Sequence, residues 1–158
     1  MIELIYETHS TTVDNEAGIA TGWLPGELSE VGREQALELG ERRRDVDAVF
    51  SSDLGRALET VAIAFFDADV PIFHDWRLRD CDYGALSGAP LDELELEKHF
   101  DVPFPGGESY ADVLARVESF VRDLRRSWDG KRVLVVPHAA PRWALQQLFE
   151  ERDSTFSV

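Results

Sequence analysis

The feature that most constrains the fold is a set of short apolar runs that alternate with segments of helical periodicity. Val133–Val136 is apolar at every position, which is typical of a parallel strand buried on both faces. Ile2–Tyr6 and Asp47–Phe50 indicate two more short strands, of which we expect the first to be buried as well. Strands that alternate with helices predict a three-layer α/β/α sandwich with a largely parallel central sheet. Such sheets bind ligands at the carboxyl ends of their strands.

Capping residues and apolar periodicity predict where the helices begin. Ser29, Asp53 and Ser109 each precede an amphipathic segment and are expected to cap a helix. Pro141 suits the first turn of a closing helix. The other segments carry weaker patterns, and we expect a loop over Glu16–Leu28, a short strand over Pro71–Phe73, and an irregular stretch over Arg77–Gly107 with one helix around Leu91–His99.

Length, charge and cysteine usage limit the classes of function. A chain of 158 residues fits one domain, 1–158. A formal net charge of -15 repels nucleic acid and anionic membranes, so neither is an expected partner. The sequence shows neither an apolar run that could span a bilayer nor a signal peptide. Cys81 is the single cysteine and forms no internal disulfide, which predicts a cytoplasmic protein.

Three of the predicted strands lead into residues suited to phosphate. The first strand runs into His9, and the last runs into His138. The second strand is followed by Arg56, one turn into the next helix. We expect these three side chains to meet at the carboxyl edge of the sheet and hold a phosphoryl group, because guanidinium binds phosphate oxygens in a bidentate manner.

These segments resemble the histidine phosphatase superfamily, which has the phosphoglycerate-mutase-like fold. Thr8-His9-Ser10 lies in register with the family's Arg-His-Gly triplet, and Ser51-Ser52-Asp53-Leu54 matches its second block. Pro105-Gly106-Gly107-Glu108-Ser109 is similar to a block common in the phosphatase branch. Val135-Val136-Pro137-His138 matches the block of the second histidine. The resemblance covers nearly the whole chain in the right order.

The resemblance implies a role for each matched residue. His9 would attack phosphorus and form a phosphohistidine, and His138 would donate hydrogen bonds to the phosphoryl oxygens. Arg56 would clamp those oxygens, and Asp80 would act as general acid and then as general base. Neither a metal ion nor a cofactor is needed, because cationic side chains neutralise the phosphoryl charge. Further candidates for phosphate binding are Ser10, Thr12, Asn15 and Arg142.

The sequence also departs from the family pattern. Thr8 replaces the first arginine, Ser10 and Ala139 replace glycines, and Asp80 is shorter than the usual glutamate. Little chain follows the last predicted helix. Two interpretations of this loss stay open. Arg142 is either an ordinary residue on the face of the last helix, in which case the site is weakened, or it reaches back and rewires the site together with Glu7. We favour the second slightly, because a carboxylate beside a phosphate site needs a cation.

Two functions therefore stay open. The first is a phosphomonoester hydrolase that acts through a phosphohistidine on a small phosphorylated molecule, with reduced activity. The alternative is a catalytically weakened relative that binds a phosphorylated ligand or partner. A mutase is least favoured, because the segment between Asp80 and Gly107 leaves little lid. A metal site built from His9, His138 and Asp80 matches no familiar zinc spacing.

Overall fold

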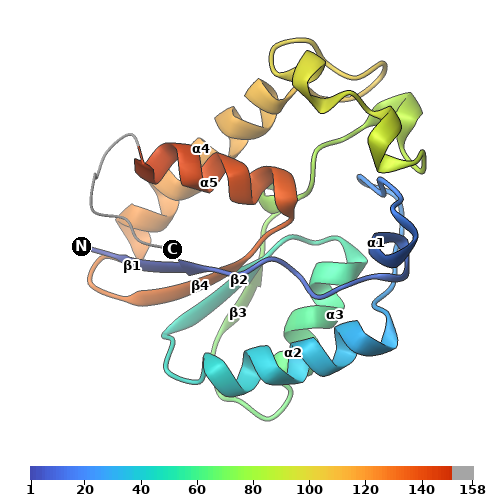
Figure 1. Ribbon diagram of the computed structural model, residues 1–158. Coiled ribbons are helices and arrows are strands. Elements are labelled where there is room, and N and C mark those ends of the chain that lie inside the picture. Colours follow the sequence, from blue (N-terminus) through green and yellow to red (C-terminus); the bar gives the residue numbers. More distant parts are fainter. Residues whose placement is uncertain (151–158) are drawn as a thin grey trace.

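The structure is a computed structural model that describes residues 1–150. Its centre is a parallel sheet with the strand order β1-β4-β2-β3. The strands are β1 (Glu3–Tyr6), β2 (Ala48–Ser51), β3 (Ile72–His74) and β4 (Arg132–Val136). Two layers of helices cover the sheet, α2 (Glu30–Arg42) with α3 (Gly55–Ala64) on one face and α4 (Tyr110–Ser127) with α5 (Ala139–Glu150) on the other (Figure 1). The predicted three-layer α/β/α sandwich is confirmed.

Strand β4 links the two hydrophobic cores. Val133 and Val135 belong to the core under α4 and α5, whereas Leu134 and Val136 belong to the core under α2 and α3. All four side chains are fully buried. The uniformly apolar run is thus explained by a strand with a protein layer on each side.

Strand β1 differs from the prediction. It lies at the edge of the sheet with β4 as its one neighbour, and its residues are half-buried or exposed. The expectation of a buried strand over Ile2–Tyr6 was wrong, because an apolar run is compatible with an edge strand as well as with a central one.

The irregular regions also differ in detail. Asp53 does not cap α3, whose N-cap is Leu54; its carboxylate binds Arg79 instead. The helix expected around Leu91–His99 is two short 3-10 helices, Leu91–Glu93 and Leu96–His99, separated by Leu94 and by Glu95, which has φ 47°. Two more 3-10 helices, Trp76–Leu78 and Gly84–Leu86, precede them. A short helix α1 (Val13–Ala17) begins just after β1, where no helix was predicted.

Gly32 lets helix α2 pack closely against the segment that follows β1. A Cβ atom at this position would lie 1.9 Å from the carbonyl oxygen of Thr11, so only glycine lets α2 approach that backbone. The Ser29 hydroxyl caps α2 by accepting from Gly32 N, and it also donates to Thr11 O. The start of α2 therefore positions the segment that carries His9. Within residues 1–150, none of the helices combines the length and the apolar character needed to cross a membrane.

Candidate active site

The carboxyl edge of the sheet gathers the predicted polar residues. His9 follows β1, Arg56 lies in the first turn of α3, and His138 immediately precedes α5. Asp80 follows the 3-10 helix Trp76–Leu78. A pocket of about 240 Å³ opens here, lined by Thr8, His9, Thr11, Asn15, Ile19, Ala20, Thr21, Arg56, Asp80, Tyr83, Leu91 and Ala139.

The His9 imidazole is held in one orientation. Its Nδ1 atom lies 2.7 Å from the carbonyl oxygen of Ser10, which can only accept, so Nδ1 carries the proton. Nε2 is then left with its lone pair. Burial lowers the pKa of His9 to about 4, although the hydrogen bond to Ser10 acts in the opposite direction. At neutral pH the ring is therefore uncharged and has a free basic nitrogen.

His138 lies against His9 and is fully buried. The two ring centroids are 4.8 Å apart. His138 Nε2 lies 2.6 Å from Ser52 Oγ, which also accepts a hydrogen bond from Leu54 N. The one acceptor found for the Ser52 hydroxyl proton, among the described residues, is His138 Nε2, so Nδ1 of His138 carries the ring proton. That Nδ1 atom has no partner in the described structure.

We predict that Ser52 sets the tautomer of His138. In Ser52→Ala, Nε2 loses its donor and the proton redistributes between the two nitrogens, which nitrogen-15 chemical shifts of the imidazole would report. The free energy of unfolding should fall by about 1–3 kcal/mol, because a buried polar atom is left unpaired. Ser51→Ala is the matched control, since Ser51 is equally buried and bonds to His74 and to a backbone carbonyl. Unchanged His138 shifts in Ser52→Ala would contradict the assignment.

Arg56 and Asp80 form the charged part of the pocket. Arg56 is 3% exposed and donates to Gly22 O at 2.7 Å, and its Nη2 lies 3.6 Å from Asp80 Oδ2. Asp80 Oδ1 accepts from Cys81 N at 2.9 Å. Burial raises the pKa of Asp80, although Arg56 and the backbone N–H groups of Cys81 and Ala140 oppose the shift. The carboxyl group therefore keeps its proton to a higher pH than an exposed aspartate does.

Arg116 supports Asp80 from behind. Its guanidinium makes a bidentate pair with Glu108, both contacts being 2.9 Å long. It also donates to the carbonyl oxygens of Arg77, Arg79 and Asp80 at 2.7–2.8 Å. This buried side chain thereby ties α4 to the segment that presents Asp80.

Of the other residues predicted to bind phosphate, only Asn15 lines this pocket. Asn15 lines the pocket, although its Oδ1 accepts from Thr12 N in the capping box of α1. Thr12 is fully buried, and its hydroxyl accepts from Asn15 N rather than lining the pocket. Ser10 and Arg142 do not line the pocket either; they border a neighbouring cavity.

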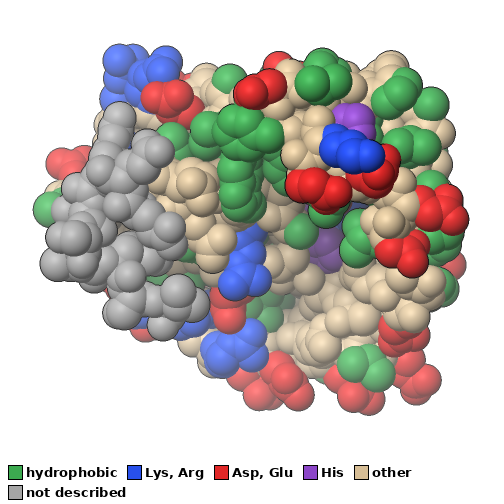
Figure 2. Space-filling view, turned by 45° about the horizontal axis from the view of Figure 1, so that its top comes forward, with side chains coloured by type: hydrophobic (Ala, Val, Ile, Leu, Met, Phe, Trp, Pro, Cys, Tyr) green, Lys and Arg blue, Asp and Glu red, His purple; other side chains and the backbone are tan. Residues whose placement is uncertain are grey.

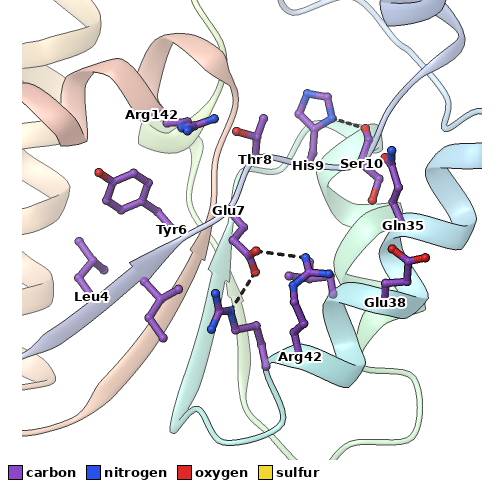
Figure 3. A pocket seen from close by; sticks show the side chains of 13 residues that line it. Leu4, Tyr6, Glu7, Thr8, His9, Ser10, Gln35, Glu38, Arg42 and Arg142 are labelled. Atoms are coloured by element: carbon purple, nitrogen blue, oxygen red, sulfur yellow. Dashed lines mark hydrogen bonds and ion pairs between the residues drawn. The ribbon is translucent and has the colours of Figure 1, made fainter. Parts of the chain in front are cut away.

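That neighbouring cavity has a volume of about 570 Å³ and lies between β1 and α2 (Figure 3). Thr8 and His9 separate it from the pocket, since they line both. Glu7 points into the cavity and pairs with Arg42 at 3.1 Å and Arg43 at 3.0 Å. Glu7 is thus paired with two arginines at the end of α2 and not with Arg142, which removes the argument from Glu7 for a rewired site.

Sequence reasoning missed two residues that shape the site. Ser52 belongs to a matched block, but no role was assigned to it. Arg116 carried a signal that could have been used, because it stands three residues after Val113 and four before Phe120 on the buried stripe of α4. A charged residue at such a position is paired, since an unpaired buried charge is costly. Among residues 1–150, no cluster of three His, Cys, Asp or Glu side chains could hold a metal ion.

A parallel α/β sandwich with two facing histidines, an arginine and a carboxyl group at the carboxyl edge of its sheet defines the phosphoglycerate-mutase-like class of proteins. The sequence profile of the histidine phosphatase superfamily (branch 1) matches residues 8–156. The chain belongs to this superfamily.

Relatives of known name include both mutases and phosphatases. A 2,3-bisphosphoglycerate-dependent phosphoglycerate mutase of Methylobacterium sp. (strain 4-46) is 33% identical, over 93% of this chain and 80% of its own length. Phosphoserine phosphatase 1 of Hydrogenobacter thermophilus is 30% identical, over 92% of this chain and 74% of its own.

Solved structures agree with the fold. Bacillus stearothermophilus YhfR superposes with a TM-score of 0.85 at 29% identity, covering 97% of this chain and 82% of its own. A mycobacterial glucosyl-3-phosphoglycerate phosphatase, solved with VO3, gives a TM-score of 0.81 at 30% identity and covers 95% of this chain and 82% of its own.

Proposed function

We propose that the protein is a phosphomonoester hydrolase that acts through a phosphohistidine at His9. The observation that carries this proposal is the state of His9, whose Nδ1 is held by Ser10 O while its pKa lies far below neutral. A neutral imidazole with a free Nε2 lone pair is the form that can attack phosphorus. Asp80, with a raised pKa, supplies an acid within the same pocket.

The chemistry follows from this arrangement in two steps. His9 Nε2 attacks phosphorus, the bond to the alcohol oxygen breaks, and Asp80 gives that oxygen its proton. Water then attacks the phosphohistidine, Asp80 takes a proton from the water, and the P–N bond breaks to release phosphate. Arg56 holds phosphoryl oxygens throughout, since phosphoryl transfer depends on positioning and charge stabilisation. His138 is fully buried against His9 and is not among the residues that line the pocket; its Nδ1–H, which has no partner among the described residues, is the further donor of this proposal.

A panel of small phosphomonoesters tests the proposal. We expect slow phosphate release that chelators do not change, and a radiolabelled phosphate on His9 when the reaction is quenched. The absence of hydrolysis for every ester, in folded protein that still binds phosphate, would favour the second candidate function, a ligand-binding member of the family. Thr8 is the observation behind this alternative, because it removes a cation from the pocket wall.

The pH dependence should report His9 and Asp80. kcat/KM should rise with pH through about 4, because His9 must lose its proton to attack. It should fall again at higher pH, as Asp80 loses the proton that it gives to the alcohol. In Asp80→Asn the falling limb should disappear, and dividing the two profiles removes the ionisation of the substrate itself. A wild-type profile of the same shape as that of Asp80→Asn would exclude Asp80 as the acid.

Replacing Thr8 by arginine should raise turnover by more than about tenfold, equivalent to roughly 1.4 kcal/mol. The reason is that Thr8 Oγ1 is buried with no hydrogen-bond partner among residues 1–150, while Glu7 is already neutralised by Arg42 and Arg43. Initial rates with a simple ester measure the effect. Thr8→Met controls for size without charge. An unchanged rate in Thr8→Arg would mean that another cation, such as Arg142, already serves the transferred group.

A further inference from the structure

The pocket is poor in positive charge. The ionisable side chains among its lining residues are His9, Arg56, Asp80 and Tyr83. Burial lowers the pKa of His9 to about 4 and raises the pKa of Tyr83, so both side chains are neutral at pH 7. Arg56 is then the one permanent cation among these lining residues.

The guanidinium of Arg56 already has partners within the protein. Its Nη2 donates to Gly22 O at 2.7 Å, its Nη1 lies 3.5 Å from Leu24 O, and Asp80 lies 3.6 Å away. The donors that remain are needed by the phosphoryl group itself. A second anionic group on the substrate would therefore find no cation of its own on this wall.

The remaining wall is neutral and partly apolar. Ile19, Ala20 and Leu91 offer hydrocarbon, whereas Asn15 and Thr21 offer polar groups. The Thr21 hydroxyl donates to Asp14 Oδ2 at 2.7 Å, which brings a negative charge close behind the wall.

Two other arginines, Arg79 and Arg142, are not among the residues that line the pocket. Arg79 donates two hydrogen bonds to the carboxylate of Asp53, at 2.6 and 2.7 Å, and its guanidinium lies over the Trp23 ring. Arg142 borders the neighbouring cavity, on the other side of Thr8. In the space-filling view, a histidine shows in a hollow, with several acidic side chains above it and to its right, and with Lys or Arg side chains farther above it and to its left (Figure 2). The lining of the pocket itself thus offers a carboxylate no cation other than Arg56.

We propose that the substrate of this site is a phosphomonoester whose alcohol is small and carries no negative charge. The inference rests on the proposed hydrolysis and adds the substrate class. The volume of about 240 Å³ supports a small alcohol, because pockets for drug-sized ligands begin at about 300 Å³. It also distinguishes this chain from an enzyme for phosphorylated acids, whose carboxylate needs a partner.

Two matched pairs of esters test the inference. Glycerol 3-phosphate and 3-phosphoglycerate share a three-carbon skeleton and differ in a hydroxymethyl group against a carboxylate. Phosphoethanolamine and phosphoserine differ by a carboxylate. We expect kcat/KM to be at least about tenfold higher for the ester without the carboxylate in each pair. Equal values, or a preference for the acid, would overturn the proposal.

A gain-of-charge variant sharpens the test. Leu91 is 47% exposed at the pocket wall, so Leu91→Arg should be tolerated and should raise the relative rate for 3-phosphoglycerate. Leu91→Met is the neutral control. If 3-phosphoglycerate is preferred by the wild type and the preference is lost in Arg142→Gln, the carboxylate binds in the neighbouring cavity and the proposal is wrong.

Failure of the hydrolytic function can be told apart from failure of this inference. If no ester is hydrolysed, the proposed function fails. The affinity of the protein for each ester of a pair, measured by calorimetry, then still shows how a carboxylate on the alcohol affects binding. Tighter binding of glycerol 3-phosphate than of 3-phosphoglycerate would support the neutral-alcohol pocket. Tighter binding of 3-phosphoglycerate would overturn it.

Discussion

Replacing His9 by alanine is expected to lower kcat for phosphomonoester hydrolysis by at least about a thousandfold, because the variant loses the attacking nitrogen. The pocket itself should persist, since the hydrogen bond of His9 Nδ1 to Ser10 O is local and Ser10 N is held separately by Thr60 Oγ1 at 3.1 Å. Steady-state rates with a simple ester, together with a circular dichroism spectrum of the folded variant, measure the effect.

His74→Ala is the matched control for this experiment. His74 ends β3 at the same edge of the sheet, but its side chain is exposed and bonds to Ser51 Oγ at 2.8 Å, away from the pocket lining. We expect His74→Ala to retain most of the activity. Wild-type turnover in His9→Ala, or equal losses in both variants, would refute nucleophilic catalysis by His9.

Replacing Arg116 by methionine should reduce the free energy of unfolding by about 3–5 kcal/mol, because it breaks a buried ion pair and leaves Glu108 uncompensated. Methionine keeps an unbranched apolar stem of similar reach. The carbonyl oxygens of Arg77, Arg79 and Asp80 lose their donor as well, so the segment that presents Asp80 is released. Urea unfolding measures the stability.

The activity of Arg116→Met separates positioning from a general loss of stability. At a temperature where the variant is fully folded, we expect kcat to fall more for alkyl phosphates than for p-nitrophenyl phosphate, whose leaving group needs no acid. Arg122→Met, on the exposed side of the same helix, should change stability by less than about 0.5 kcal/mol. Equal losses for both kinds of ester would show that Arg116 does not act through Asp80.

The two histidines contribute no positive charge to the free protein at neutral pH. Sequence reasoning assigned the neutralisation of phosphate to cationic side chains in general. In the structure, burial lowers the pKa of His9 and of His138, which leaves both rings neutral in the free protein. Among the described residues that line the pocket, Arg56 alone then carries permanent positive charge, which makes the replacement of the family's arginine by Thr8 more consequential.

The sequence by itself determined the layered architecture and the edge of the sheet where the polar residues meet. The reason is that alternation of apolar strands and amphipathic helices is a local pattern, and a parallel sheet brings the carboxyl ends of its strands together. The capping box at Ser109 was predicted on the same basis, since its partner Asp112 is three residues away.

Only the tertiary structure decided which strands lie side by side and which side chains form ion pairs and hydrogen bonds. Whether β1 lies at the centre or at the edge of the sheet depends on strand order, which no local pattern encodes. Glu7 pairs with Arg42 and Arg43 rather than Arg142 because the end of α2 packs beside β1. The hydrogen bond at His138 Nε2 comes from Ser52, 86 residues away along the chain. Contacts of this kind arise from packing between distant segments, and the ionisation of each histidine follows from the burial that this packing creates.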